Sequence, residues 1–234
     1  DHVLYQAKVV LEGGSFHVDG EGTMLTTEEC VLNKNRCCDD TCHRTKESMN
    51  EIFRAYLGVT KVIYLPKGVE GDVDTDGHVD NMCAFVKPGH VVLTWPEDEI
   101  ETDPQYQRSR EAYEVLSSTT DAQGRALTIH KLPHPVGPAM MTTADDMEDL
   151  EIDPTTGKML REEDTSLAGS YVNFYLANGA VIMPRFGAET DERALSVMRE
   201  LYPEREVVMV DTREILLGGG NIHCITQQQP STRV

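Results

Sequence analysis

The chain has 234 residues, with 40 Asp and Glu against 21 Lys and Arg and a formal net charge of −19. This balance argues against a nucleic-acid partner, because duplex affinity depends on Lys and Arg that neutralise phosphates, and it favours cationic ligands. No stretch approaches the roughly 20 apolar residues that cross a bilayer, so a membrane partner is not expected either.

Short runs that are rich in Val and Ile, or that alternate in polarity, are bounded by Gly, Pro, Asp or Asn and predict strands. In chain order these runs are residues 8–11, 61–65, 82–86, 90–94, 127–131, 170–176, 180–184, 207–210 and 222–226. Apolar residues at helical spacing predict helices over residues 46–57, 104–117 and 191–201. Strands that alternate with helices of this length indicate an α/β architecture.

Residues 140–164 differ from the rest because Asp and Glu crowd among few apolar residues. The sequence Asp153-Pro154-Thr155-Thr156-Gly157 within this segment indicates a turn. We predict an exposed loop or a frayed helical insertion here. Strand patterns resume at Ser170, so the segment marks no domain boundary and residues 1–234 are expected to form a single domain.

The six cysteines are few for this length and irregularly spaced, unlike those of a secreted disulfide scaffold. We therefore predict reduced thiols in a cytosol-like compartment, and a cytoplasmic protein. The cluster Cys37-Cys38-Asp39-Asp40-Thr41-Cys42-His43 offers the ligand types that zinc prefers, but a paired C-x2-C spacing and a second half-site are missing. A thiol-rich surface loop is the favoured interpretation.

A weak internal repeat connects distant parts of the chain. Residues 11–18 (LEGGSFHV) parallel residues 217–224 (LGGGNIHC), and residues 76–80 (DGHVD) are a looser echo. Each segment is a glycine-bearing turn that is expected to lead into a strand. The chain is therefore expected to contain repeated β-α units, and a ring of such units would bring these turns to one point.

Cys224 lies just beyond three consecutive glycines, Gly218-Gly219-Gly220. Glycines in series are expected where a backbone takes positive φ or must come close to something else, so a ligand could approach this cysteine. A nucleophilic role requires a thiolate and a neighbour that lowers the pKa of the thiol. A buried structural cysteine stays open as the alternative.

Four carboxylates and one imidazole are concentrated in residues 72–80. On a strand, His78 and Asp80 would share one face, which would place an acid/base imidazole beside a carboxylate that can hold a cation. An Asp-rich turn or a calcium loop is the alternative, although the closing Glu of an EF-hand loop is absent. Glu12, at the carboxyl end of the apolar run Val9-Val10-Leu11, lies either in solvent or in a cleft, and its position alone favours solvent.

Residues 11–23, 26–30, 74–81, 170–175 and 214–230 together resemble the agmatine deiminase family. The resemblance runs through nearly the whole chain and has its most specific motifs at the two ends. It implies the pentein fold, a ring of five ββαβ units around a central active site. Residues 1–234 are then expected to form one pentein catalytic domain.

The resemblance also implies roles for individual residues. Cys224 is the expected nucleophile, His78 the general acid/base, Glu12 the carboxylate that orients this imidazole, and Asp80 and Asn221 the substrate-binding residues. The implied substrate is a small cationic guanidine, agmatine, which is hydrolysed to N-carbamoylputrescine and ammonia in putrescine biosynthesis. No metal and no organic cofactor are expected, and a homo-oligomer stays open.

The chain departs from the family pattern at its amino end. The family carries a segment with a Trp and a second guanidinium-binding Asp, whereas the single tryptophan here, Trp95, has a different context. Roughly the first two of the five units are therefore expected to be missing. Three alternatives stay open: a deiminase of free or peptidyl arginine, an incomplete domain that only binds a ligand or partner, and a cysteine hydrolase of peptide amides.

Overall fold

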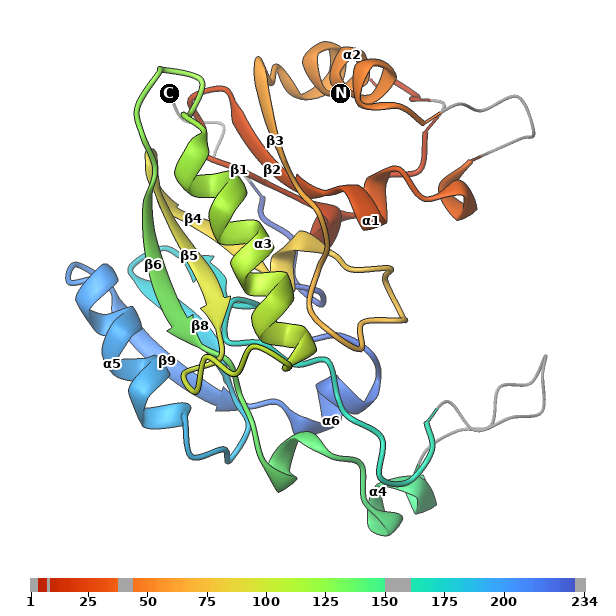
Figure 1. Ribbon diagram of the computed structural model, residues 1–234, viewed down its shortest axis with the longest axis vertical. Coiled ribbons are helices and arrows are strands. Elements are labelled where there is room, and N and C mark those ends of the chain that lie inside the picture. Colours follow the sequence, from red (N-terminus) through yellow and green to blue (C-terminus); the bar gives the residue numbers. More distant parts are fainter. Residues whose placement is uncertain (1–3, 8, 38–43, 150–160, 230–234) are drawn as a thin grey trace.

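A computed structural model describes residues 4–7, 9–37, 44–149 and 161–229. Three units of one kind follow one another in this part of the chain. Each unit has an antiparallel hairpin, then a helix, then a third strand that pairs in parallel with the second strand of the hairpin (Figure 1). The α/β class and the expectation of repeated ββαβ units are thus confirmed.

The units have the same order of elements. The first contains β1 (Phe16–Val18), β2 (Thr23–Thr27), α2 (Lys46–Leu57) and β3 (Lys61–Leu65). The second contains β4 (Cys83–Lys87), β5 (His90–Trp95), α3 (Pro104–Ser118) and β6 (Thr128–Pro133). The third contains β7 (Tyr175–Ala177), β8 (Ala180–Arg185), α5 (Asp191–Leu201) and β9 (Glu206–Asp211).

Short helices and 3-10 turns connect these elements. They are η1 (Gly13–Ser15), α1 (Glu28–Val31), η2 (Lys34–Arg36), η3 (Val79–Asn81), η4 (Pro138–Met140), α4 (Ala144–Asp149) and α6 (Arg213–Leu217). Among the described residues no helix is both long and apolar enough to cross a membrane.

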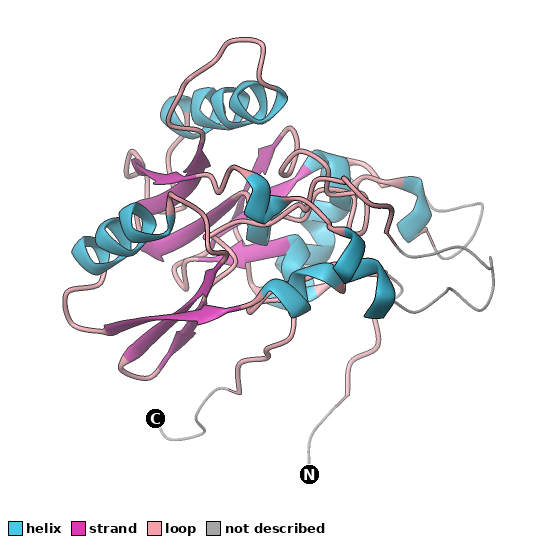
Figure 2. Cartoon of the chain, turned by 90° about the horizontal axis from the view of Figure 1, so that it is seen from below, coloured by secondary structure: helices cyan, strands magenta, loops and turns pink. Residues whose placement is uncertain are grey.

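Neighbouring units share their helices. Helix α3 contacts β5 and β6 of its own sheet and also β3 of the unit before it, and α5 contacts both β9 and β6. Figure 2 shows the strands from below, with helices on several sides of them. The sheets therefore lie inside and the long helices outside, as expected for units that follow one another around a common centre.

Three clusters of buried apolar side chains form the core. Met24 and Phe53 belong to the first cluster, Leu93 and Leu116 to the second, and Met198 of α5 to the third. Burial of apolar area of this kind is the main favourable contribution to folding. The loops at the ends of the strands are held in place by this core.

The three long helices match the predicted ranges to within one residue, and α2 and α3 carry strong local signals at their ends. Thr45 caps α2 in a capping box with Ser48, and Gly58 ends that helix at φ 67°. The side chain of Asp103 caps α3, and Pro104 occupies its first turn.

The predicted strands over residues 61–65, 82–86, 90–94, 127–131, 180–184 and 207–210 are confirmed, with shifts of at most two residues at either end. Strand β2 was missed because it is buried on both faces: Met24 belongs to the first core cluster and Leu25 to the second. Its threonines are also buried, since Thr26 Oγ1 donates to the carbonyl of Ser15 (2.7 Å) and Thr27 Oγ1 to that of Gly77 (2.6 Å).

The strand predicted over residues 222–226 is wrong, because this segment is a turn. The strand predicted over residues 170–176 is wrong for most of its length, since only β7 at its end is extended. In both places side chains bind backbone amides that a sheet would use. Ser170 Oγ accepts from the amide of Val172 (3.1 Å), and Asn221 Oδ1 accepts from the amide of Ile222 (2.8 Å).

Two further predictions need correction. Residues 9–11 of the predicted strand 8–11 form no strand, although Val9 and Leu11 pack against the first core cluster; Lys8 lies outside the described residues. His78 and Asp80 do not lie on a strand either, because η3 follows a turn in which Asp76 and Gly77 have φ values of 56° and 77°.

For the acidic segment 140–164 we predicted an exposed loop or a frayed helical insertion, and its described part agrees with a helical insertion but is not exposed throughout. It begins with Met140, which is buried in the third cluster, and contains α4. Residues 150–160 lie outside the described part of the chain, as does most of the Cys37–His43 cluster.

Candidate active site

The three glycine-bearing turns of the sequence repeat meet at one cavity of about 550 Å³. Gly13 and Gly14 come from the first turn, His78 from the second and Gly219 from the third. The predicted convergence of these turns is thus confirmed. Four of the predicted site residues line this cavity: Glu12, His78, Asp80 and Cys224.

Because Gly14 has no side chain, the first turn can lie in close contact with the second. A Cβ at this position would lie 2.5 Å from Asp80 Oδ2 and 2.6 Å from His78 Nδ1. Both groups are buried, at 2% and 7% exposure. The two side chains can therefore lie side by side at the cavity only because residue 14 is glycine.

We expect Gly14→Ala to lower turnover of the protein's substrate by roughly 10²-fold, because the new methyl group displaces His78 and Asp80 together. Steady-state kinetics at saturating substrate measure this loss. Gly13→Ala is the matched control, since a Cβ there meets no atom within 4 Å. An equal loss in both variants would contradict the close contact as its cause.

Asp80 connects the nucleophile candidate to a second imidazole. Its Oδ2 lies 2.9 Å from Nδ1 of His223 and 3.5 Å from Sγ of Cys224. Its Oδ1 is buried and has no hydrogen-bond partner among the described residues, and the same holds for Nε2 of His78. Buried polar atoms are normally hydrogen-bonded, so these two atoms indicate where a polar ligand binds.

The thiol of Cys224 is protonated at neutral pH. Although part of Cys224 is open to solvent, desolvation by the surrounding protein raises the pKa of the thiol to about 11, and the charge of Asp80 adds to this effect. The fully buried Asn173 acts in the opposite direction, because its Nδ2 donates to Sγ (3.3 Å). A thiolate therefore needs a positive charge nearby.

Alkylation by iodoacetamide, followed at the Cys224 peptide by mass spectrometry, reports this pKa. We expect the rate to rise with pH and to reach half its maximum near pH 11. Asp80→Asn removes a charge that raises the pKa of the thiol, so labelling at pH 8 should become faster. Unchanged labelling in this variant would show that Asp80 has no influence on the thiol.

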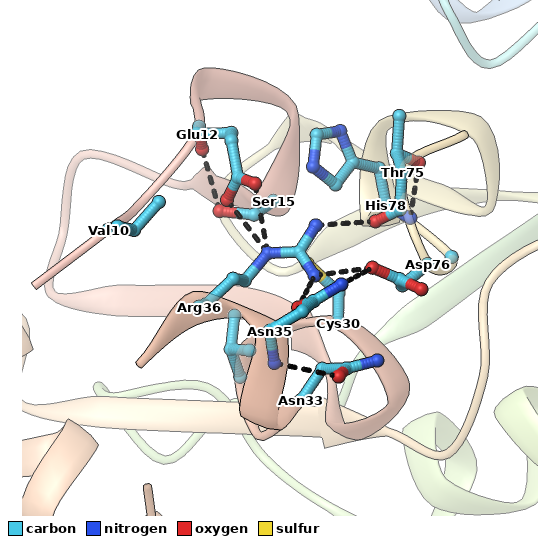
Figure 3. A network of polar contacts seen from close by, with 12 residues as sticks. Val10, Glu12, Ser15, Cys30, Asn33, Asn35, Arg36, Thr75, Asp76 and His78 are labelled. Carbon is cyan, nitrogen blue, oxygen red and sulfur yellow. Dashed lines mark hydrogen bonds and ion pairs between the residues drawn. The ribbon is translucent and has the colours of Figure 1, made fainter. Parts of the chain in front are cut away.

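Glu12 is paired in the cleft, although 37% of its side chain stays exposed, and its partner could not be predicted from the sequence. Figure 3 shows the guanidinium of Arg36 facing the carboxylate, with Nε 2.9 Å and 3.0 Å from its two oxygens. Burial would raise the pKa of Glu12, but the hydrogen bond and charge of Arg36 lower it below its usual range. Glu12 is thus an ionised carboxylate near His78, with a carboxylate oxygen and a ring nitrogen within 4.8 Å of each other.

His17 belongs to the sequence repeat and was not predicted as a site residue, but the structure places it in the cavity wall. Burial, together with the neighbouring His223, lowers the pKa of His17 to about 4, so it is neutral at physiological pH. Its Nδ1 accepts from the amide of Phe85 (3.2 Å), which leaves the proton on Nε2. Asn173 and His223 were also missed as site residues, because single polar residues inside apolar runs carry no distinctive spacing.

Asn221 is not brought to the main cavity. It lines a separate small hollow behind Gly219 and Gly220, where it is 1% exposed. Its Oδ1 accepts from the next amide, so it shapes the turn that carries Cys224. A substrate-binding role for Asn221 stays a prediction that this position does not favour.

One cluster among the described residues has metal-ligand types: Glu12, Cys30 and His78 offer ligand atoms within 4.8 Å of one another. Arg36 occupies both oxygens of Glu12, and desolvation raises the pKa of the Cys30 thiol to about 12. A protonated thiol and a paired carboxylate are poor ligands for a cation. This chemistry does not favour a metal at the cluster.

The pattern of the Porphyromonas-type peptidyl-arginine deiminase family matches residues 1–230. The chain belongs to this family. Among curated members, the chain is similar to the agmatine deiminase of Medicago truncatula, with 53% identity over 229 residues that cover 97% of this chain and 59% of the relative. It is also similar to the agmatine deiminase of Pseudomonas fluorescens, with 51% identity, 95% coverage of this chain and 57% of the relative.

Solved structures show the same fold in this deiminase family. The agmatine deiminase of Enterococcus faecalis has a TM-score of 0.84 and 41% identity, with 96% of this chain and 58% of that chain covered. A variant of the C. jejuni agmatine deiminase, solved with substrate bound, has a TM-score of 0.75 and 26% identity, with 95% of this chain and 56% of that chain covered. The pentein assignment is thereby confirmed, and the chain spans less than two thirds of the length of these relatives.

Proposed function

We propose that the protein is an agmatine deiminase that hydrolyses the guanidinium of agmatine through a covalent intermediate on Cys224. The observation that carries the proposal is the approach of Asp80 to Cys224, with Oδ2 3.5 Å from Sγ, in a cavity that His78 also lines. A carboxylate at this distance can hold a guanidinium with its carbon close to the sulfur. The names of the relatives that are about half identical support the same activity.

Binding is the first task of the site. A guanidinium is delocalised and always protonated, and carboxylates bind it by charge-assisted hydrogen bonds in its plane. Asp80 supplies such a carboxylate, with Oδ1 open to a donor. The bound cation offsets the carboxylate charge that helps to raise the pKa of the thiol, so the thiolate forms when substrate is present.

The first chemical step forms a carbon–sulfur bond and breaks a carbon–nitrogen bond. The thiol proton passes to His78, and the Cys224 thiolate attacks the guanidinium carbon. The imidazolium of His78 then donates its proton to a terminal nitrogen, which leaves as ammonia. The alkyl chain stays attached through an amidino-cysteine, and Glu12 holds the imidazole in the orientation that both proton transfers need.

The second step restores the enzyme. His78 takes a proton from water, and the water oxygen bonds to the amidino carbon. The carbon–sulfur bond breaks with its electron pair on sulfur, which gives N-carbamoylputrescine, and sulfur regains a proton from the protonated ureido group. His78 passes its proton to ammonia. Agmatine and water thus give N-carbamoylputrescine and ammonium.

The charge of the cavity supports agmatine over arginine. Arginine differs from agmatine by an α-carboxylate, which a binding site must pair with a cation or a set of donors. The described residues that line the main cavity include Glu12 and Asp80 but no Lys or Arg. A dication without a carboxylate is the better match for such a wall.

Steady-state kinetics of the complete protein with agmatine, free arginine and an arginine peptide test the proposal. We expect ureido product and ammonia from agmatine, with kcat/KM at least roughly 10²-fold above that for arginine. A preference for either arginine substrate would replace the agmatine assignment by the arginine deiminase alternative. Absence of ureido product from all three would favour the ligand-binding domain without catalysis.

We propose a cytoplasmic location on the basis of the cysteine spacing, which does not suit a secreted disulfide scaffold. A homo-oligomer stays a prediction that size-exclusion chromatography with light scattering would test.

A further inference from the structure

Arg36 is a buried cation between two segments of the candidate site. It is 5% exposed and ends η2. Figure 3 shows its guanidinium between Glu12 on one side and the Thr75–Asp76 turn on the other. A buried charge is costly unless it is paired and hydrogen-bonded, so the guanidinium of Arg36 depends on its carboxylate and carbonyl partners to remain buried.

The planar guanidinium reaches these partners in two directions. Nε donates to both oxygens of Glu12 (2.9 Å and 3.0 Å). Nη1 donates to Oδ2 of Asp76 (2.8 Å), and Nη2 donates to the carbonyl of Thr75 (2.6 Å). The five fixed donors of arginine suit this arrangement, whereas the single ammonium of lysine cannot span it.

The turn that Arg36 binds leads directly into His78. Asp76 has a φ of 56°, a conformation that a residue with a side chain adopts only when its surroundings hold it there. The amide of His78 donates to Oγ1 of Thr75 (3.2 Å), so the start of His78 is tied to the same turn. A shift of this turn would therefore move His78 relative to Glu12.

We propose that Arg36 is a positioning residue of the deiminase reaction, which fixes the Glu12 carboxylate and the turn before His78 relative to each other. This inference rests on the proposed function. Arg36 also keeps Glu12 ionised: burial opposes ionisation, and the Arg36 hydrogen bond and charge overcome it. The pKa of Asp76 is also lowered, by its hydrogen bonds to Asn35 and Arg36. Glu12, Asp76 and Arg36 together therefore present a net negative charge to the imidazole of His78.

Arg36→Met in the complete protein tests the role through the pH dependence of agmatine turnover. Without the guanidinium, only a backbone hydrogen bond and the charge of His78 oppose the effect of burial on Glu12, so the pKa of Glu12 rises and the acid limb of kcat should move to higher pH. We expect kcat to fall by roughly 10²-fold, because Glu12 and His78 are no longer held in the correct relative position. KM should stay close to the wild-type value, because Asp80 still holds the guanidinium of the substrate.

Arg44→Met is the matched control. Arg44 also stabilises this region. Among the described residues, its guanidinium donates hydrogen bonds to backbone carbonyls, those of Val31 (2.6 Å), Arg36 (2.7 Å) and Val10 (3.1 Å). Its loss should lower stability while leaving the acid limb in place. Rates are expressed per folded molecule, so that reduced folding alone moves neither kcat nor the pH profile.

An unshifted acid limb in Arg36→Met, or the same response in Arg36→Met and Arg44→Met, would overturn the positioning role. If Arg36→Met does not fold, Arg36→Lys carries the test: lysine can pair with Glu12 but cannot also reach Thr75 and Asp76, so kcat should fall with KM retained. Wild-type kcat in a folded Arg36→Lys protein would equally overturn the proposal. The wild type is measured first, and its failure to turn over agmatine would refute the proposed function instead.

Discussion

Replacing Cys224 with alanine is expected to lower kcat for agmatine by a factor on the order of 10⁶, because Cys224 is the one thiol among the described residues that line the cavity. Asp80 and His78 remain in place, so binding of agmatine should persist. Ureido product measured at high enzyme concentration gives the residual rate, and isothermal titration calorimetry gives the affinity.

Cys83→Ala is the control for this variant. Cys83 is a buried thiol in the second core cluster, where desolvation keeps it protonated far above physiological pH. Its loss should reduce stability slightly and leave turnover per folded molecule near the wild-type value. Activity that survives Cys224→Ala at more than a small fraction of wild type would refute Cys224 as the nucleophile.

His78→Gln is expected to lower kcat by roughly 10²- to 10⁴-fold, because the proposed imidazole donates a proton to ammonia in one step and removes one from water in the next. Gln offers an amide of similar length that cannot exchange protons at neutral pH. KM for agmatine should change little, since the carboxylate of Asp80 is retained. Steady-state kinetics between pH 6 and 9 provide the measurement.

A matched substitution is available on the surface of the second sheet. His130 stacks on His90 with ring centroids 5.4 Å apart and is not among the residues that line the cavity. His130→Gln should therefore leave kcat unchanged. Equal losses at positions 78 and 130 would indicate a general effect on folding rather than lost proton transfer.

Local signals explain which parts of the fold could be predicted from the sequence. The cap at Thr45, the proline at position 104 and the glycine at position 58 act within one turn of their helix, so the helix ranges are accurate. Strand β2 has no such signal. Its burial on both faces comes from packing against two units, and a single sequence window does not contain that information.

In the candidate site, too, the residues that a local signal marks could be predicted and those that meet only in the folded protein could not. Cys224, His78 and Asp80 could be chosen because a glycine turn and a charge cluster mark them in the sequence, whereas the role of Glu12 came from the family resemblance, since its position alone favoured solvent. Arg36 could not, because it lies 24 residues from Glu12 and 40 from Asp76 along the chain and meets both only in the folded protein. The strand assumed for residues 78–80 was wrong, yet both side chains reach the cavity, because Gly14 lets the first turn approach them closely.

The intact mass of the complete protein after a rapid acid quench in the presence of agmatine tests the covalent intermediate on Cys224 most directly. Covalent catalysis by Cys224 predicts a species heavier than the free enzyme by the mass of agmatine less that of ammonia, with the added mass on the Cys224 peptide. The species should be absent from Cys224→Ala. Turnover with no adduct under single-turnover conditions, or an adduct on another residue, would contradict covalent catalysis by Cys224.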